Sequence, residues 1–243
     1  MSRERRKNKT TKTIAVIVAC LMLAAVGGTI AWMTAKDHLT NEFLVGDFTD
    51  PDTKPDNPGQ EIPDEDKENG KLNGHLYEPS WVANSKLTPG AAIAKDPMVG
   101  IGDGSENAYV YLYVKNNAEV PSNIYFTLND GWEAVDGYAS KVTDLTPDDP
   151  AYGSGKTYYS GGLFKCSDVL TGKKDADSWT NKAFSNVYVK NSATTETLVT
   201  EGSDGTSLVV TALLHQATSG DTTTDLESVA DQWAKEQATE LAQ

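Results

Sequence analysis

Short alternating runs dominate the pattern of apolar and polar residues along the chain. In the clearest, AYVYLYVKN at 108–116, three tyrosines alternate with Val110, Leu112 and Val114. Large side chains on both faces predict an inner strand. Further strand-like runs occur at 91–101 (where Pro97 indicates an edge or a bulge), 123–128, 157–165, 184–190 and 207–216. Because Gly-, Pro- and Asp-rich turns separate these runs, we expect an all-β fold, an antiparallel β-sandwich of jelly-roll-like type.

One segment near the C-terminus follows the helical period instead. Between residues 225 and 240, side chains suited to a contact face recur at helical spacing: Leu226, Val229, Ala230, Trp233 and Gln237. Thr224 and Glu227 have the T-x-x-E spacing of a capping box, which marks the start of a helix. We therefore expect a helix over 225–240 that packs on the sandwich through Trp233.

Two segments of different character precede the globular part. Residues 39–46, LTNEFLVG, place Phe43 and Val45 on one parity and predict a strand. The tract at 49–75 is rich in acids and contains four prolines, so it holds too little apolar surface to offset the entropy of ordering. We expect this tract to be a solvated linker or long loop, and residues 76–243 to form the sandwich domain with its helix.

The start of the chain has the order of an export signal. Residues 1–13 are basic, and the thirteen residues at 14–26 are all apolar. A positively charged region followed by a short apolar one is typical of a signal peptide, which we place at 1–31. Its cleavage would release a secreted, extracellular or cell-surface protein.

The cleavage site itself is predicted from small side chains. Thr29 and Ala31 occupy the −3 and −1 positions of a cut between Ala31 and Trp32. In the alternative interpretation the apolar run extends through Met33 to twenty residues, close to the ~20 that cross a bilayer. The chain would then contact the membrane, but only through this uncleaved leader.

The charge of the chain argues against one class of partner. Lys and Arg total 21 against 35 Asp and Glu, a net charge of −14. Residues 1–31 contain six of the basic residues and one acid, so their removal leaves 15 basic and 34 acidic residues, a net charge of −19. Such a surface repels phosphate backbones, and we expect no nucleic-acid partner.

Few residues could carry catalytic or metal chemistry. The two cysteines, Cys20 and Cys166, exclude a disulfide framework, and Cys166 is expected to be a small buried apolar residue. The three histidines, His38, His75 and His215, form no H-E-x-x-H motif. We therefore expect no enzyme, no metal site and no cofactor.

Two acidic, turn-forming clusters could supply oxygen ligands to Ca²⁺. They are DGSEN at 103–107 and NDGWEAVDG at 129–137. Neither has the D-x-[DN]-x-[DN]-G spacing of a calcium loop with its distal Glu. We therefore interpret both as solvated turns.

An ordered series of motifs resembles the TasA/camelysin family of exported Gram-positive proteins. The series begins with GGTIAWMTAKDHLTNEFLVGDF at 27–48, in which Asn41, Phe43 and Gly46 fit N-x-F-x-x-G. The later matches are Glu78-Pro79-Ser80-Trp81, Leu87-Thr88-Pro89-Gly90, Lys95-Asp96-Pro97, AYVYLYVKN at 108–116 and LVVTALLHQA at 208–217. The resemblance implies cleavage after Ala31 by a SipW-like signal peptidase, and subunits that self-associate into biofilm matrix fibres.

Three functions follow from the residues and the resemblance together. We expect a secreted structural protein of the cell envelope or extracellular matrix that could form fibres. The alternative is a surface adhesin or binding module that does not polymerise, and the third is a camelysin-like metalloprotease. The apolar segment at 32–48 either folds back as the domain's own first strand or inserts into a neighbouring subunit, with Phe43 and Val45 as donor-strand contacts.

Overall fold

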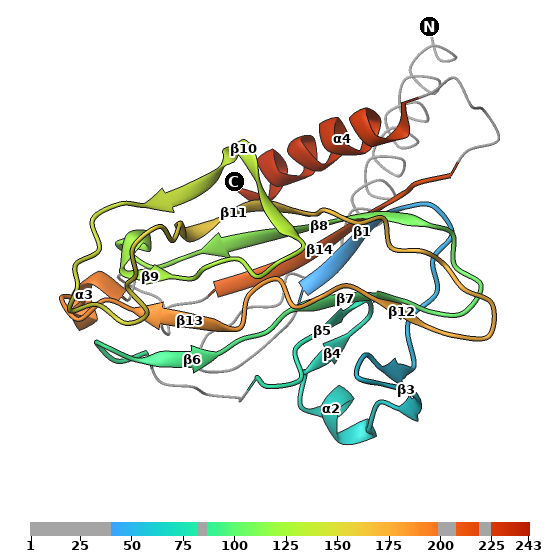
Figure 1. The fold of residues 1–243 in the computed structure, drawn as a ribbon, viewed down its shortest axis with the longest axis horizontal. Helices are drawn as coiled ribbons and strands as arrows, with labels where there is room; N and C mark the ends of the chain where they lie inside the picture. Colours follow the sequence, from blue (N-terminus) through green and yellow to red (C-terminus); the bar gives the residue numbers. More distant parts are fainter. Residues whose placement is uncertain (1–39, 82–86, 199–207, 219–224) are drawn as a thin grey trace, which may run out of the picture. The chain divides into compact units, whose positions relative to one another are not determined.

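The computed structural model describes residues 40–81, 87–198, 208–218 and 225–243, which form mostly β-strands in several sheets (Figure 1). This result confirms the predicted β-rich chain with a C-terminal helix. The longest strands form a five-stranded sheet in the order β1-β14-β8-β11-β10. Their bounds are β1 Thr40–Val45, β14 Leu208–Gln216, β8 Ala108–Asn116, β11 Tyr158–Cys166 and β10 Trp132–Val142.

Three smaller sheets, two short helices, a 3₁₀ turn and the longer helix α4 complete the described fold. The first sheet contains β12 (Ser178–Trp179), β7 (Met98–Ile101), β5 (Leu76–Tyr77) and β4 (Leu72–Asn73), in that order. The second contains β6 (Ala92–Ala94), β13 (Asn186–Val189) and β9 (Ile124–Tyr125), and the third is the hairpin β2 (Thr53–Lys54) and β3 (Asn57–Glu61). The helices are α2 (Asp64–Glu68), α3 (Thr195–Leu198), α4 (Leu226–Leu241) and a 3₁₀ turn at Pro121–Asn123.

Strand β8 lies at the centre of the five-stranded sheet, as its pattern predicts. Val110, Leu112 and Val114 are buried in the main core. The same core contains buried residues of the smaller sheets, among them Val99 of β7 and Ile124 of β9. One face of the large sheet therefore packs against the smaller sheets.

The opposite face of the large sheet is covered by α4. Tyr111, Leu163 and Leu213 form a second core with three alanines of the helix: Ala230, Ala234 and Ala238. The predicted contact face is therefore partly wrong: Ala230 is buried, but Val229 is exposed and Trp233 is half-buried. Alanines let the helix approach the large side chains of the sheet closely, which the apolar period alone did not indicate.

Polar groups fix the helix on the sheet and at its start. The ammonium group of Lys165 on β11 lies 2.7 Å from Glu227 and 2.8 Å from Asp231. The Tyr111 hydroxyl donates to Asp231 at 2.5 Å. The cap is Asp225, whose carboxylate accepts from the Ser228 backbone at 3.3 Å, so the predicted capping box is wrong by one residue.

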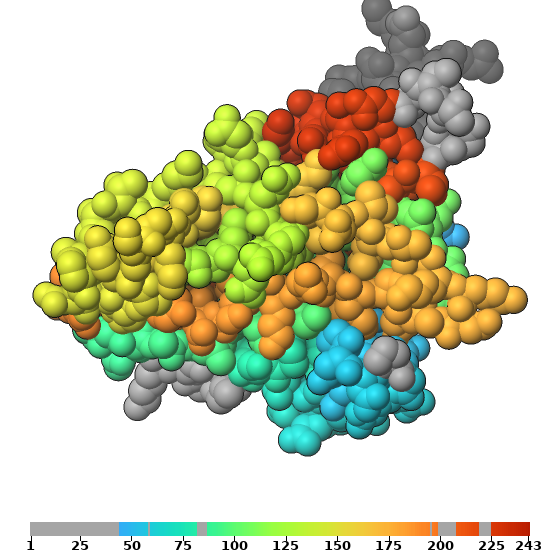
Figure 2. Space-filling view, viewed as in Figure 1, coloured from blue at the N-terminus to red at the C-terminus, as the bar shows by residue number. Residues whose placement is uncertain are grey.

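The acidic tract at 49–75 is not the solvated linker or long loop that its composition predicts. It contains β2, β3, α2 and β4, and both Ile62 and His75 are buried. Figure 2 shows the tract, in blue to teal, as a lobe of the surface beside the later segment drawn in orange. Distant residues satisfy its polar groups, which offsets the cost that its composition implies.

Two further differences concern strands of the large sheet. Strand β1 pairs with β14 in parallel, so the sheet is not wholly antiparallel. Strand β10 was not predicted, since its WEAVDGYASKV sequence does not alternate cleanly. Four of its residues, 135–138, oppose the single residue Leu163 between two paired stretches, which makes an irregular bulge larger than the usual two residues against one.

Candidate functional site

Strand β1, the expected assembly segment, lies at one edge of the large sheet. Its backbone register places Phe43 beside Leu213 and Val45 beside His215. The side chains of Leu44 and Val45 are 42% and 37% exposed. The strand that β1 covers, β14, is buried from Leu208 to His215. A strand that ends in two exposed residues, Leu44 and Val45, therefore pairs with the edge of a strand that is buried over 208–215.

The residues directly after β1 are fixed to the rest of the domain. The Asp177 carboxylate accepts from the Asp52 backbone at 2.8 Å, and from the Thr53 backbone and hydroxyl at 2.5 and 2.7 Å. The Trp179 indole donates to the Thr53 carbonyl at 3.0 Å, and Thr49 donates to the Asp103 carbonyl at 2.8 Å. We call residues 47–53 the strap.

One glycine separates β1 from the strap. Gly46 has a φ of +142°, and a Cβ atom there would lie 2.8 Å from the Phe48 ring and 2.9 Å from Gln216. Backbone in this region favours glycine. The chain can therefore change direction sharply between the edge strand and the fixed strap.

A buried histidine faces the strap from the smaller sheets. Nδ1 of His75 lies 2.7 Å from the Gly100 carbonyl, and Nε2 lies 3.6 Å from the exposed Asp50 carboxylate. Burial lowers the pKa of His75, although its Gly100 hydrogen bond and Asp50 act in the opposite direction. Desolvation therefore favours a neutral imidazole here.

The motifs E-P-x-W and K-D-P meet in the structure. The Lys95 ammonium group lies 2.7 and 2.8 Å from the two carboxylate oxygens of Glu78, and both side chains are 1% exposed. The neighbouring Asp96 accepts from the Ser80 backbone at 2.9 Å. This pairing joins two chain segments inside the domain, which is a structural role.

The remaining groups that could carry chemistry lie apart. Cys166 is buried, as predicted, and burial raises the pKa of its thiol. His215 is buried on β14, with its ring 5.5 Å from the Trp233 ring. Within the described ranges, no group of three or more His, Cys, Asp or Glu side chains could hold a metal ion, and His38 and Cys20 lie outside those ranges.

The two acidic clusters have identifiable roles in the fold. Asp103 accepts from the Asp175 backbone, and Asn107 accepts from the Gly172 backbone at 2.9 Å. The second cluster, 129–137, covers the three residues before β10 and the first half of that strand. The Asp103 and Asn107 oxygens join loops of the fold, so the interpretation of the first cluster as a purely solvated turn is incomplete.

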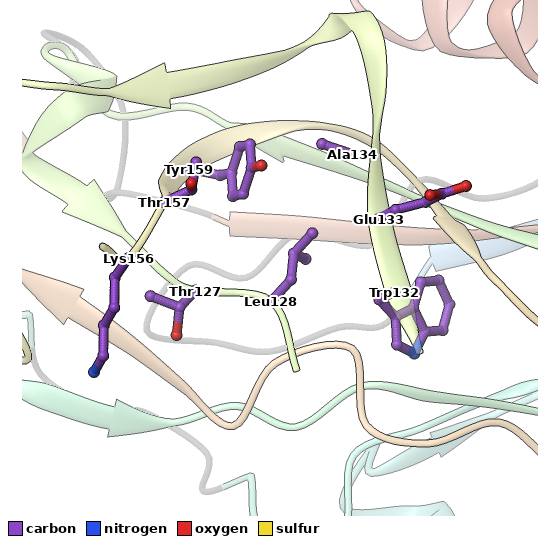
Figure 3. A pocket seen from close by; sticks show the side chains of 8 residues that line it. All are labelled: Thr127, Leu128, Trp132, Glu133, Ala134, Lys156, Thr157 and Tyr159. Carbon is purple, nitrogen blue, oxygen red and sulfur yellow. The ribbon is translucent and has the colours of Figure 1, made fainter. Parts of the chain in front are cut away.

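A pocket of about 410 Å³ opens beside the start of β10 (Figure 3). Its walls come from three separate segments, at 127–128, 132–134 and 156–159. The first two segments are neighbours in the sequence, but the third lies further along the chain, so no local pattern indicated the pocket. Its lining includes two threonine hydroxyls and the aromatic side chains of Trp132 and Tyr159, which suit a small polar ligand.

The predicted cleavage site, Ala31 and Trp32, lies outside the described residues. Across the described part of the chain, no helix has the length and apolar character needed to span a bilayer. No protein-family model, curated protein or solved structure matches this chain.

Proposed function

We propose that the chain is an exported structural protein of the cell envelope or extracellular matrix that assembles into fibres through β1. In this proposal the large sheet and the smaller sheets are the two layers of a jelly-roll-like β-sandwich. The position of β1, an edge strand with exposed Leu44 and Val45 that pairs with the buried strand β14, is the observation that carries the proposal. The resemblance to TasA and camelysin agrees with it.

An edge strand of this kind can be exchanged between subunits. If β1 left its place, the N–H and C=O groups on that edge of β14 would lose their partners. An equivalent strand from a second subunit would restore the same hydrogen bonds, with side chains such as Leu44 and Val45 filling the same positions. The net charge of −19 without residues 1–31 would oppose non-specific clumping of such subunits.

The fixed strap changes where the donor segment must begin. Slack in the tract at 49–75 cannot supply the reach, because hydrogen bonds hold the strap at Thr49, Asp52 and Thr53. For strand exchange, the chain would instead have to bend at Gly46, with β1 leaving its own domain and the strap staying in place. Residues 32–45 could then span about 50 Å when extended, at ~3.3–3.6 Å per residue.

A reversible lock on β1 tests the proposal. The double variant Val45→Cys/His215→Cys joins two register partners of β1 and β14. Adjacent strands lie ~4.8 Å apart, within the ~4.4–6.8 Å that a disulfide spans between Cα atoms. We expect the oxidised protein to stay monomeric, and fibres to appear in electron micrographs after a reductant is added. The reduced double variant controls for the substitutions themselves. Fibres formed by the oxidised protein would refute strand exchange.

A truncation that spares the strap gives a second test. Deleting residues 32–45, rather than the whole segment 32–48, should leave a folded protein that no longer assembles. Circular dichroism and sedimentation would measure both properties. If the truncated chain does not fold, β1 is an intramolecular core strand and the proposal fails.

Export and cleavage are tested at Ala31. Replacing Ala31 with Trp should trap a membrane-bound precursor, because the −1 position requires a small side chain. Mass spectrometry of the wild-type secreted protein should then give an N-terminus at Trp32. Secreted protein that still carries residues 14–31 would contradict this prediction and favour the uncleaved anchor.

The second candidate function is a surface adhesin or binding module that does not polymerise. The pocket in Figure 3 favours it, since a purely structural subunit does not need one. Metalloprotease activity stays a prediction, which zinc content and casein hydrolysis by the purified chain would test.

A further inference from the structure

The pocket beside the start of β10 has a lining of mixed polarity. Three segments contribute its eight residues: Thr127, Leu128, Trp132, Glu133, Ala134, Lys156, Thr157 and Tyr159. Its volume of about 410 Å³ lies in the range of small-molecule sites, ~300–1,000 Å³. The pocket lies on the protein surface, far in sequence from β1, and does not depend on the proposed assembly.

Tyr159 is the clearest sign of a ligand. Its side chain is only 8% exposed, and two rings hold it: Phe126, with centroids 6.5 Å apart, and Phe164, at 5.4 Å and 77°. Figure 3 shows its hydroxyl pointing into the space enclosed by the labelled side chains. Among the described residues this hydroxyl has no hydrogen-bond partner, although its backbone pairs with Phe126. The ring is buried, but the hydroxyl is not among the described buried side-chain atoms that lack a partner, so it is accessible from the pocket and can bond a ligand there.

The chemistry of the hydroxyl suits a neutral partner. Burial raises the pKa of Tyr159, so the phenol remains protonated and can both donate and accept a hydrogen bond. Thr127 and Thr157, from two different segments of the lining, add two more hydroxyls. The pocket therefore offers several neutral hydrogen-bonding groups at once.

The rest of the lining is apolar or balanced in charge. Leu128, Ala134 and Trp132 provide apolar surface. Glu133 and Lys156 are exposed and opposite in sign, so the pocket has no net charge to attract an ion. A ligand that matches must be neutral, rich in hydroxyl groups and apolar on one face.

We propose that this pocket binds one neutral sugar unit, a hexose or N-acetylhexosamine, through the Tyr159 hydroxyl. A pyranose ring combines hydroxyl groups around its edge with C–H groups on its faces, which matches the lining. Tyr159 and the two threonines exchange hydrogen bonds with the sugar hydroxyls, and Leu128 and Ala134 contact its C–H face. The unit is either a free sugar or one residue of a polysaccharide.

Saturation-transfer NMR on the full chain tests the proposal directly. The probes are glucose, galactose, mannose, N-acetylglucosamine and N-acetylgalactosamine, each also offered as a tetrasaccharide. We expect transfer to at least one neutral sugar, and an affinity about tenfold weaker for Tyr159→Phe, the loss typical of one hydrogen bond. Tyr138→Phe, an exposed tyrosine outside the pocket, should bind as the wild type does.

The outcomes distinguish a free sugar from a polysaccharide as the ligand, and they can refute the assignment of the pocket as a sugar site. Binding of a free monosaccharide supports a free-sugar ligand, and binding of tetrasaccharides alone, weakened by Tyr159→Phe, supports a polysaccharide. Thermal unfolding checks the variant: losing an unpaired hydroxyl should not lower its midpoint. The proposal is wrong if no neutral sugar binds, if Tyr159→Phe binds equally well, or if glucuronate or glucosamine binds more tightly than glucose.

Discussion

Replacing Lys95 with Met should destabilise the fold by about 3–5 kcal/mol, the cost of breaking a buried ion pair by removing one partner. Glu78 would lose the ammonium group that lies 2.7 and 2.8 Å from its two oxygens. Both side chains are 1% exposed, so water cannot replace that group without opening the domain. The magnitude follows from burial, because an exposed pair contributes little.

The double variant Glu78→Leu/Lys95→Met separates pairing from packing. Two apolar side chains of similar size remove both charges, so it should be more stable than Lys95→Met alone. Urea unfolding followed by tryptophan fluorescence would show a midpoint lowered by roughly 1–3 M for the single variant. Lys67→Met is the matched control, since Lys67 forms an exposed 3.8 Å pair with Asp52 and should cost under about 0.5 kcal/mol. The reasoning fails if Lys95→Met costs under about 1 kcal/mol, or if the double variant is the least stable.

Three further predictions concern the core, a glycine and pH. Leu112→Ala should cost about 2–5 kcal/mol in the same urea assay, and a cost well below 1 kcal/mol would mean that β8 is peripheral. Gly162→Ala should lower the thermal midpoint more than Gly137→Ala. A Cβ at Gly162 would lie 2.3 Å from the Tyr138 carbonyl oxygen, whereas a Cβ at Gly137 would meet nothing within 4 Å. Equal effects of the two substitutions would refute this reason. Burial lowers the pKa of His75, so just below pH 6.5 only the unfolded chain takes up a proton on this side chain. The free energy of unfolding should therefore decrease as the pH drops below 6.5, and it should decrease less in His75→Gln. Identical pH curves for the two proteins would contradict this prediction.

The sequence predicts secondary structure and burial most reliably where the conformation of a segment depends on its own residues. The strand at 108–116 coincides with β8, because alternating large side chains favour one conformation and one pair of buried faces. The run at 91–101 divides into β6 and β7 around Pro97, as a residue without an N–H group requires. Both predictions depend on local chemistry only.

The prediction fails where distant residues decide the structure. The strap folds because Asp177, more than 120 positions away, accepts its hydrogen bonds, and no composition rule contains that partner. Parallel pairing of β1 with β14 has no turn signal, since the strands are joined by most of the chain. The pocket around Tyr159 was missed for the same reason, because its three walls meet only in the folded protein.

The parallel pairing of β1 with β14 also determines how the domain bears load. Strand β14 is the last strand before α4, and β1 is the first described element. Tension between the two ends of the chain would pull β1 towards its start and β14 towards its end, so the strands would slide lengthwise past each other. In such shear the hydrogen bonds between the strands share the force, whereas an antiparallel edge strand pulled in the same way would peel off one bond at a time. A chain of domains joined by such strands would resist stretching through its sheets.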